Sequence, residues 1–200
     1  ELKQVAFSRP GNFFSLTDGT VVEVWRGGSA PRLASRHQAD AEVTALAVNE
    51  DGLGVIGTAD GLLTRFDADR SLVFASGGRW TALSFDAEDV IVVDDARAEL
   101  VRLTTEGGRS LIAALPGHVS ALAVANDGES FAATVDAGIL LISSTGEISS
   151  ARCDCQTQGL DRLQGNLAVW VRGAALVFDG DSGEPRLTTL PNLFSLKIGR

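Results

Sequence analysis

A unit of about forty residues recurs five times along this chain, and this repeat constrains the fold more than any other feature. The clearest copy, residues 42–78, reads EVTALAVNEDGLGVIGTADGLLTRFDADRSLVFASGG and divides into four short apolar strands separated by turns. Asp-Gly between apolar strands is a strong hairpin signal, because tight hairpin turns need positive φ. The same order recurs in residues 3–38 and 118–156, and weaker copies fill the remainder.

Two anchors on different strands give the same period. The residues that end each third strand lie 41, 37, 39 and 36 positions apart and are Trp25, Phe66, Leu103, Ile142 and Phe178. The first turns lie 41, 37, 39 and 37 positions apart and are marked by Gly11, Gly52, Asp89, Gly128 and Gly165. This period is typical of four-stranded blades arranged radially. The sequence therefore predicts an all-β fold, a β-propeller of four-stranded antiparallel blades.

Two other fold classes fit the pattern less well. Helices are disfavoured because the chain has 22 glycines and no capped stretch with a sustained 3.6-residue period. A two-sheet sandwich also uses short strands and regular turns, but it imposes no four-strand period repeated along the chain.

The repeat divides the chain into one expected propeller domain, residues 1–200. The repeats are expected at about 3–41, 42–78, 79–117, 118–156 and 157–192, with a further strand starting in 193–200. A closed five-bladed ring has no place for a surplus inner strand, so we expect a fragment of a six- to eight-bladed propeller. Self-association or the remainder of a longer chain would then close the ring, because open strand edges pair readily.

Charge and hydropathy limit the classes of partner. The chain has 26 Asp and Glu against 17 Lys and Arg, a net charge of −9, which repels phosphate backbones. No apolar run approaches the roughly 18 residues that cross a bilayer. We therefore expect no nucleic-acid partner and no membrane association, whereas the sequence assigns no compartment.

Motifs for catalysis, cofactors and metals are missing from the sequence. It contains no P-loop, dinucleotide fingerprint, Gly-x-Ser-x-Gly elbow or paired-His metal motif, so we expect no cofactor and no metal site. Cys153 and Cys155 would share one side of a fourth strand, but a zinc site needs a second ligand pair. Oxidation of this thiol pair or adventitious metal capture stays open.

Several segments resemble known propeller families. GTADGLLTRFD, residues 57–67, resembles the WD-repeat pattern; LVFD (176–179) repeats its aromatic-Asp ending and Gly117-His118 looks like its Gly-His dipeptide. Ile142 stands where the WD aromatic belongs, and no unit assembles that family's His, Ser/Thr, Asp and Trp set. Residues 91–108 resemble NHL-type blades and residues 178–187 resemble quinoprotein-type turns. The resemblance implies a bacterial-type propeller and leaves the subfamily undecided.

Most candidate binding residues belong to turns between second and third strands, which in a propeller lie on the face where ligands usually bind, and His118 belongs to a connection between units. The candidates are Asp18, Asp60, Arg97, His118, Asp136 and Arg172. Turn carboxylates commonly accept backbone N–H groups and hold the turn. Arginine is enriched at interfaces, which favours Arg97 and Arg172 as binding residues. For His118 a structural hydrogen bond is the simpler interpretation.

These observations favour a non-catalytic scaffold that binds a protein or peptide through the loops of one face. The alternative is a propeller enzyme, or a carbohydrate- or cofactor-binding module, with its site in the central channel. Convergent carboxylates and a deep polar pocket in that channel would favour the alternative. A purely structural module within a larger surface protein is a third hypothesis, because fold does not determine function.

Overall fold

The computed structural model describes residues 2–8, 11–124, 130–134, 138–152, 157–163, 166–171, 174–178 and 185–186. Within these residues all regular elements are β-strands, which form five four-stranded antiparallel sheets. None of the described segments is a helix with the length and apolar character needed to span a bilayer.

Each sheet is formed by four consecutive strands. The first contains β1 (Gln4–Phe7), β2 (Phe13–Thr17), β3 (Val21–Arg26) and β4 (Arg32–Gln38). The second contains β5 (Val43–Val48), β6 (Gly54–Thr58), β7 (Leu62–Phe66) and β8 (Ser71–Ser76). The third contains β9 (Trp80–Asp86), β10 (Asp89–Asp94), β11 (Glu99–Leu103) and β12 (Arg109–Ala114). The fourth contains β13 (Val119–Val124), β14 (Ser130–Thr134), β15 (Gly138–Ile142) and β16 (Ile148–Arg152). The fifth contains β17 (Thr157–Leu163), β18 (Asn166–Val171), β19 (Ala174–Phe178) and β20 (Pro185–Arg186).

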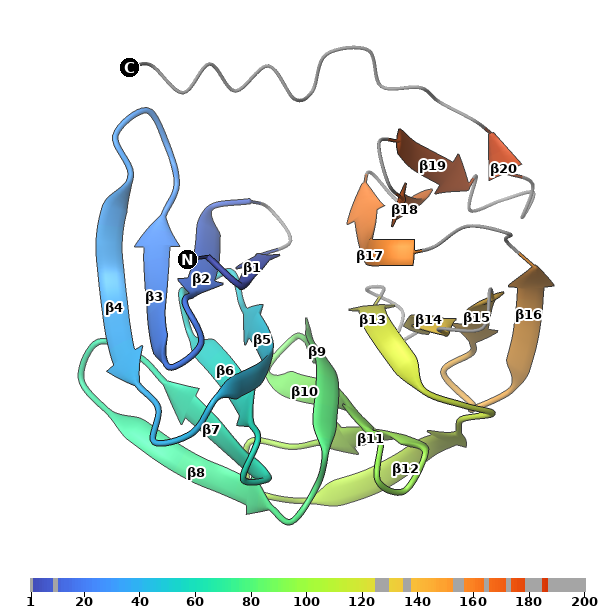
Figure 1. The fold of residues 1–200 in the computed structure, drawn as a ribbon, viewed down its shortest axis with the longest axis horizontal. Coiled ribbons are helices and arrows are strands. Elements are labelled where there is room, and N and C mark those ends of the chain that lie inside the picture. Colours follow the sequence, from blue (N-terminus) through green and yellow to red (C-terminus); the bar gives the residue numbers. More distant parts are fainter. Residues whose placement is uncertain are drawn as a thin grey trace.

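The sheets follow one another around an arc (Figure 1). The first strand of each sheet lies toward the centre and the fourth lies outside, and consecutive inner strands β1, β5, β9, β13 and β17 contact one another. This radial arrangement of four-stranded sheets confirms the predicted fold class, a β-propeller. Two predictions concern residues outside the described ones: the further strand in 193–200 and the pair Cys153 and Cys155. The assignment of residues 1–200 to a single domain stays a prediction.

The hydrophobic core lies between sheets, because alternating side chains of a strand project from its two faces. Val22 and Val24 of the first sheet pack against Leu46, Ile56 and Phe66 of the second. Equivalent clusters join the second sheet to the third and the third to the fourth. The core is thus divided among blade interfaces, and each blade depends on its neighbour for burial.

Glycine permits the close approach of the second and third sheets. A Cβ added to Gly57 in β6 would lie 2.7 Å from the Trp80 Cβ of β9. The buried Trp80 indole Nε1 donates to the Gly61 carbonyl oxygen over 2.9 Å. Trp80 therefore fixes the second sheet against the third through both packing and a hydrogen bond.

The first sheet has an apolar face that no described sheet covers. Strand register places Phe7, Phe14, Trp25 and Leu33 in one row across it. Phe7 is 64% exposed, whereas Phe85, near the end of the inner strand of the third sheet, is 9% exposed and packs against the second sheet. The row is thus the kind of face that a neighbouring blade covers elsewhere in the molecule.

Candidate functional site

The turns between second and third strands and the connections between sheets lie at the same end of the blades, because successive antiparallel strands alternate in direction. Backbone hydrogen bonds join each connection to a turn, and the donor and acceptor pairs are Ala39 N to Thr20 O at 2.9 Å, Gly77 N to Gly61 O at 2.9 Å and Leu115 N to Ala98 O at 2.7 Å. We call this end the connector face; its described part comprises residues 18–20, 39–42, 59–61, 77–79, 94–98 and 115–118. Each of these bonds ties a connection to the turn of the sheet that precedes it.

Asp18 and Asp60 occupy corresponding turns and satisfy bonds within them. Asp18 Oδ1 accepts the backbone N–H groups of Val21 at 3.1 Å and Thr20 at 3.4 Å. These bonds stabilise the carboxylate and lower the pKa of Asp18 below its ordinary value. Asp60 Oδ1 accepts the Thr58 hydroxyl at 2.5 Å. No described contact joins the two carboxylates, so the structure does not bring these two candidates together.

Arg97 and His118, in contrast, are brought together by two adjacent carboxylates, Asp94 and Asp95. Arg97 Nη1 lies 2.5 Å from Asp94 Oδ2 and 3.5 Å from the Gly77 carbonyl oxygen. His118 Nδ1 contacts Asp95 Oδ1. Asp95 Oδ2 lies 3.4 Å from Arg79 Nε. We call this cluster of Arg79, Asp94, Asp95, Arg97 and His118 the charge network.

Asp94 anchors the charge network because its side chain is 0% exposed. Besides Arg97, it accepts the Arg79 backbone N–H at 3.3 Å and Arg109 Nη2 at 3.5 Å. Arg109 is also 2.5 Å from Glu99 Oε2. The hydrogen bond and charge of Asp94 raise the pKa of Arg97 above its ordinary value. A buried carboxylate with several donors therefore fixes the position of the cations around it.

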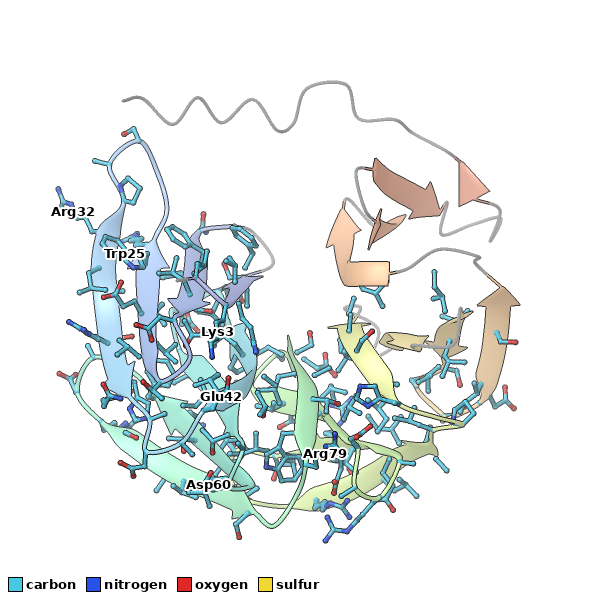
Figure 2. The ribbon with its side chains drawn as sticks, in the orientation of Figure 1. Lys3, Trp25, Arg32, Glu42, Asp60 and Arg79 are labelled. Atoms are coloured by element: carbon cyan, nitrogen blue, oxygen red, sulfur yellow. The ribbon has the colours of Figure 1, made fainter. Side chains whose placement is uncertain are left out.

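A separate ion pair, outside the charge network, joins the first two sheets at the connector face. Lys3 Nζ lies 2.7 Å from Glu42 Oε1, and Figure 2 shows the two side chains meeting between these sheets. Lys3 lowers the pKa of Glu42, first by its hydrogen bond and then by its charge.

Sequence reasoning identified Arg97 and His118 but missed the residues that hold them. Asp94, Asp95 and Arg79 were outside the candidate set, although Asp-Asp directly after an apolar strand in VVDDARAE was a visible signal. Lys3 and Glu42 gave no signal, since their pairing depends on the contact between two sheets. The candidates Asp136 and Arg172 lie outside the described residues.

The inner strands line a central cavity of about 760 Å³ that is open to solvent. Alanines and hydroxyl groups of β5, β9 and β13 form much of its wall, and Glu50 and Asp86 are the acidic residues among the described lining. Both follow or end an inner strand, so they lie at the end opposite the connector face. Asp86 Oδ2 is paired with Arg102 Nη2 at 2.7 Å. The described part of the chain holds no group of three or more Asp, Glu, His or Cys that could bind a metal ion.

Comparison with known proteins supports the fold and leaves the family open. The sequence matches no protein-family profile and no curated protein. Among solved structures, streptogramin B lyase is similar over 95% of this chain and 69% of its own, with TM-score 0.70 and 13% identity. A nidogen/laminin complex is similar over 95% and 80%, with TM-score 0.77 and 11% identity. YCF48 bound to D1 peptide is similar over 93% and 67%, with TM-score 0.62 and 13% identity. These neighbours are propeller-like and include both an enzyme and binding proteins.

Proposed function

We propose that this propeller is a non-catalytic scaffold that binds a protein or peptide through its connector face. The observation that carries the proposal is the charge network, in which buried Asp94 and neighbouring Asp95 hold Arg79, Arg97 and His118. These residues come from two sheet-to-sheet connections and the turn between them. The network thus presents several charged groups at one place on a rigid surface.

Rigidity is what makes the charge network suitable for recognition. Ordering a long side chain on binding costs about 0.5–1.5 kcal/mol, so cations that are already held in place bind at lower cost. Arginine is also frequent among the residues that dominate binding energy. A catalytic role would instead need a nucleophile or a substrate-facing acid and base beside the network. In the charge network, the carboxylates Asp94 and Asp95 are already bonded to Arg97, Arg79 and His118.

The similar folds are compatible with this proposal but do not select it. Two of the similar structures are a nidogen/laminin complex and YCF48 bound to D1 peptide, whereas another is streptogramin B lyase. Since fold alone does not decide function, the proposal rests on the geometry of the connector face.

Selection from a random peptide display library tests the proposal. We expect enriched peptides that bind the native protein and lose binding to an Arg79→Gln/Arg97→Gln variant. The matched control is Arg26→Gln/Arg70→Gln, which removes the same charge from exposed sites at the opposite end of the blades. Enriched peptides that bind both variants as well as native protein would contradict a site on the connector face.

The central cavity supports the second candidate, a small-ligand or carbohydrate site. Its volume of about 760 Å³ is in the range that holds drug-sized ligands. The lining hydroxyl of Ser84 offers a hydrogen bond to such a ligand. Calorimetric titration of a sugar and cofactor panel, compared between native protein and a Ser84→Phe variant of unchanged thermal midpoint, tests it. Binding that is lost in Ser84→Phe and kept in Arg79→Gln/Arg97→Gln would favour the cavity over the connector face.

A further inference from the structure

In the charge network, the arginine side chains lie at the surface and the carboxylates lie beneath them. Arg79 and Arg97 expose 73% and 50% of their side chains, whereas Asp94 and Asp95 expose 0% and 11%. His118 also lies in the exposed layer. A partner that approaches here therefore meets guanidinium and imidazole groups first, although the whole chain carries a net charge of −9.

Both arginines retain hydrogen-bond donors for a ligand. A guanidinium has five N–H donors in a planar fork. Arg79 contacts Asp95 through Nε, and within the described part of the chain its terminal Nη1 and Nη2 have no partner. Arg97 contacts Asp94 and Gly77 through Nη1, which leaves its Nη2 without a described partner. The fork geometry matches the two oxygens of a carboxylate.

The positions of these donors are linked through one carboxylate. Asp94 Oδ1 accepts the Arg79 backbone N–H and Asp94 Oδ2 accepts Arg97 Nη1. The Arg79 guanidinium itself contacts the next residue, Asp95, so the two exposed guanidiniums are held by adjacent carboxylates. An extended segment carrying two nearby acidic side chains could contact both at once.

We propose that the exposed cations of the charge network bind an acidic peptide segment, whose carboxylates pair with Arg79 and Arg97. This inference rests on the proposed function and specifies its partner. Long polyanions are disfavoured, because the surrounding net charge of −9 repels every phosphate or carboxylate that extends beyond the patch. The recognised element is thus a short acidic segment and not an acidic polymer.

Fluorescence anisotropy with three labelled decapeptides of equal length tests the inference. One is Glu-rich, one is Lys-rich, and one carries Ser in place of Glu. We expect the Glu-rich peptide alone to bind native protein. Arg79→Gln/Arg97→Gln should weaken it about tenfold, since each exposed ion pair contributes about threefold to fivefold. Arg26→Gln/Arg70→Gln should change the affinity less than about twofold, because both residues lie at the opposite end.

Two controls make the outcomes decisive. The thermal midpoints of both variants must match native protein, so that lost binding is not lost folding. Rescue by Arg79→Lys/Arg97→Lys should be partial, because lysine keeps the charge and lacks the fork.

Equal binding of the Glu-rich and Lys-rich peptides, or unchanged binding to Arg79→Gln/Arg97→Gln, would overturn the inference. The library selection gives a separate outcome. Peptides that need Arg79 and Arg97 for binding but carry no acidic residues would overturn the inference and leave the proposed function intact.

Discussion

Replacement of Asp94 tests whether the charge network is a built element of the fold. Asp94→Ala removes the acceptor of the Arg79 backbone N–H at 3.3 Å and of Arg97 Nη1 at 2.5 Å. Arg109 keeps Glu99 as a partner at 2.5 Å. The variant therefore leaves one partly buried N–H and one arginine without their main acceptor.

The size of the effect follows from these two losses. A buried donor left without a partner costs about 1–3 kcal/mol. The bond to Arg97 is charge-assisted, but its guanidinium is half exposed and water replaces part of the interaction, so we assign it about 1 kcal/mol. Together they predict a loss of about 2–4 kcal/mol. For a chain of this size that corresponds to a midpoint about 4–16 °C lower.

Thermal unfolding followed by circular dichroism, with urea unfolding as a second measure, checks this value. Asp94→Asn should lose about half as much, because its amide oxygen can still accept the Arg79 N–H. Asp60→Ala is the matched control: its carboxylate is exposed, and Thr58 Oγ1 keeps the Leu62 carbonyl at 3.2 Å, so the midpoint should stay within about 2 °C. A midpoint for Asp94→Ala equal to that of Asp60→Ala would refute the argument that Asp94 anchors the network.

Three further predictions concern packing, pH and association. Gly57→Ala should destabilise the protein by about 1–3 kcal/mol, because its Cβ would lie 2.7 Å from a neighbouring tryptophan; Gly117→Ala, with open space around it, should cost less than about 1 kcal/mol in the same urea unfolding assay. Burial lowers the pKa of His37 below its ordinary value of 6.5, so the folded state binds protons less readily than the unfolded state. Stability should therefore fall as pH drops through 6.5, and His37→Phe should flatten this decline in thermal midpoints measured from pH 8 to pH 5. Phe7→Ser should reduce self-association seen by light scattering, whereas Leu72→Ser, a similarly exposed control at 59%, should not; equal masses for both variants and native protein would count against the apolar row of the first sheet as the contact.

The sequence alone determined the order of elements, because strands and turns are local. Alternating apolar residues predict each strand, and turn residues such as Gly52 and Gly61, which adopt positive φ, end them. Strand alternation then places Asp18, Asp60, Arg97 and His118 on one face. The carboxylate of Asp18 could also be predicted to hold its own turn, since its partners lie two and three residues away.

Tertiary structure alone decided which charges meet and which apolar face stays open. Arg79, Asp94 and His118 come from a connection, a strand end and the next connection, and 15 to 23 residues separate the atoms that pair. Their contact depends on strand register and on the packing of one sheet against the next, which a residue's immediate neighbours do not specify. For the same reason Phe7 and Phe85 look alike in sequence, but one is exposed and the other is covered, because burial in this fold is supplied by the adjacent blade.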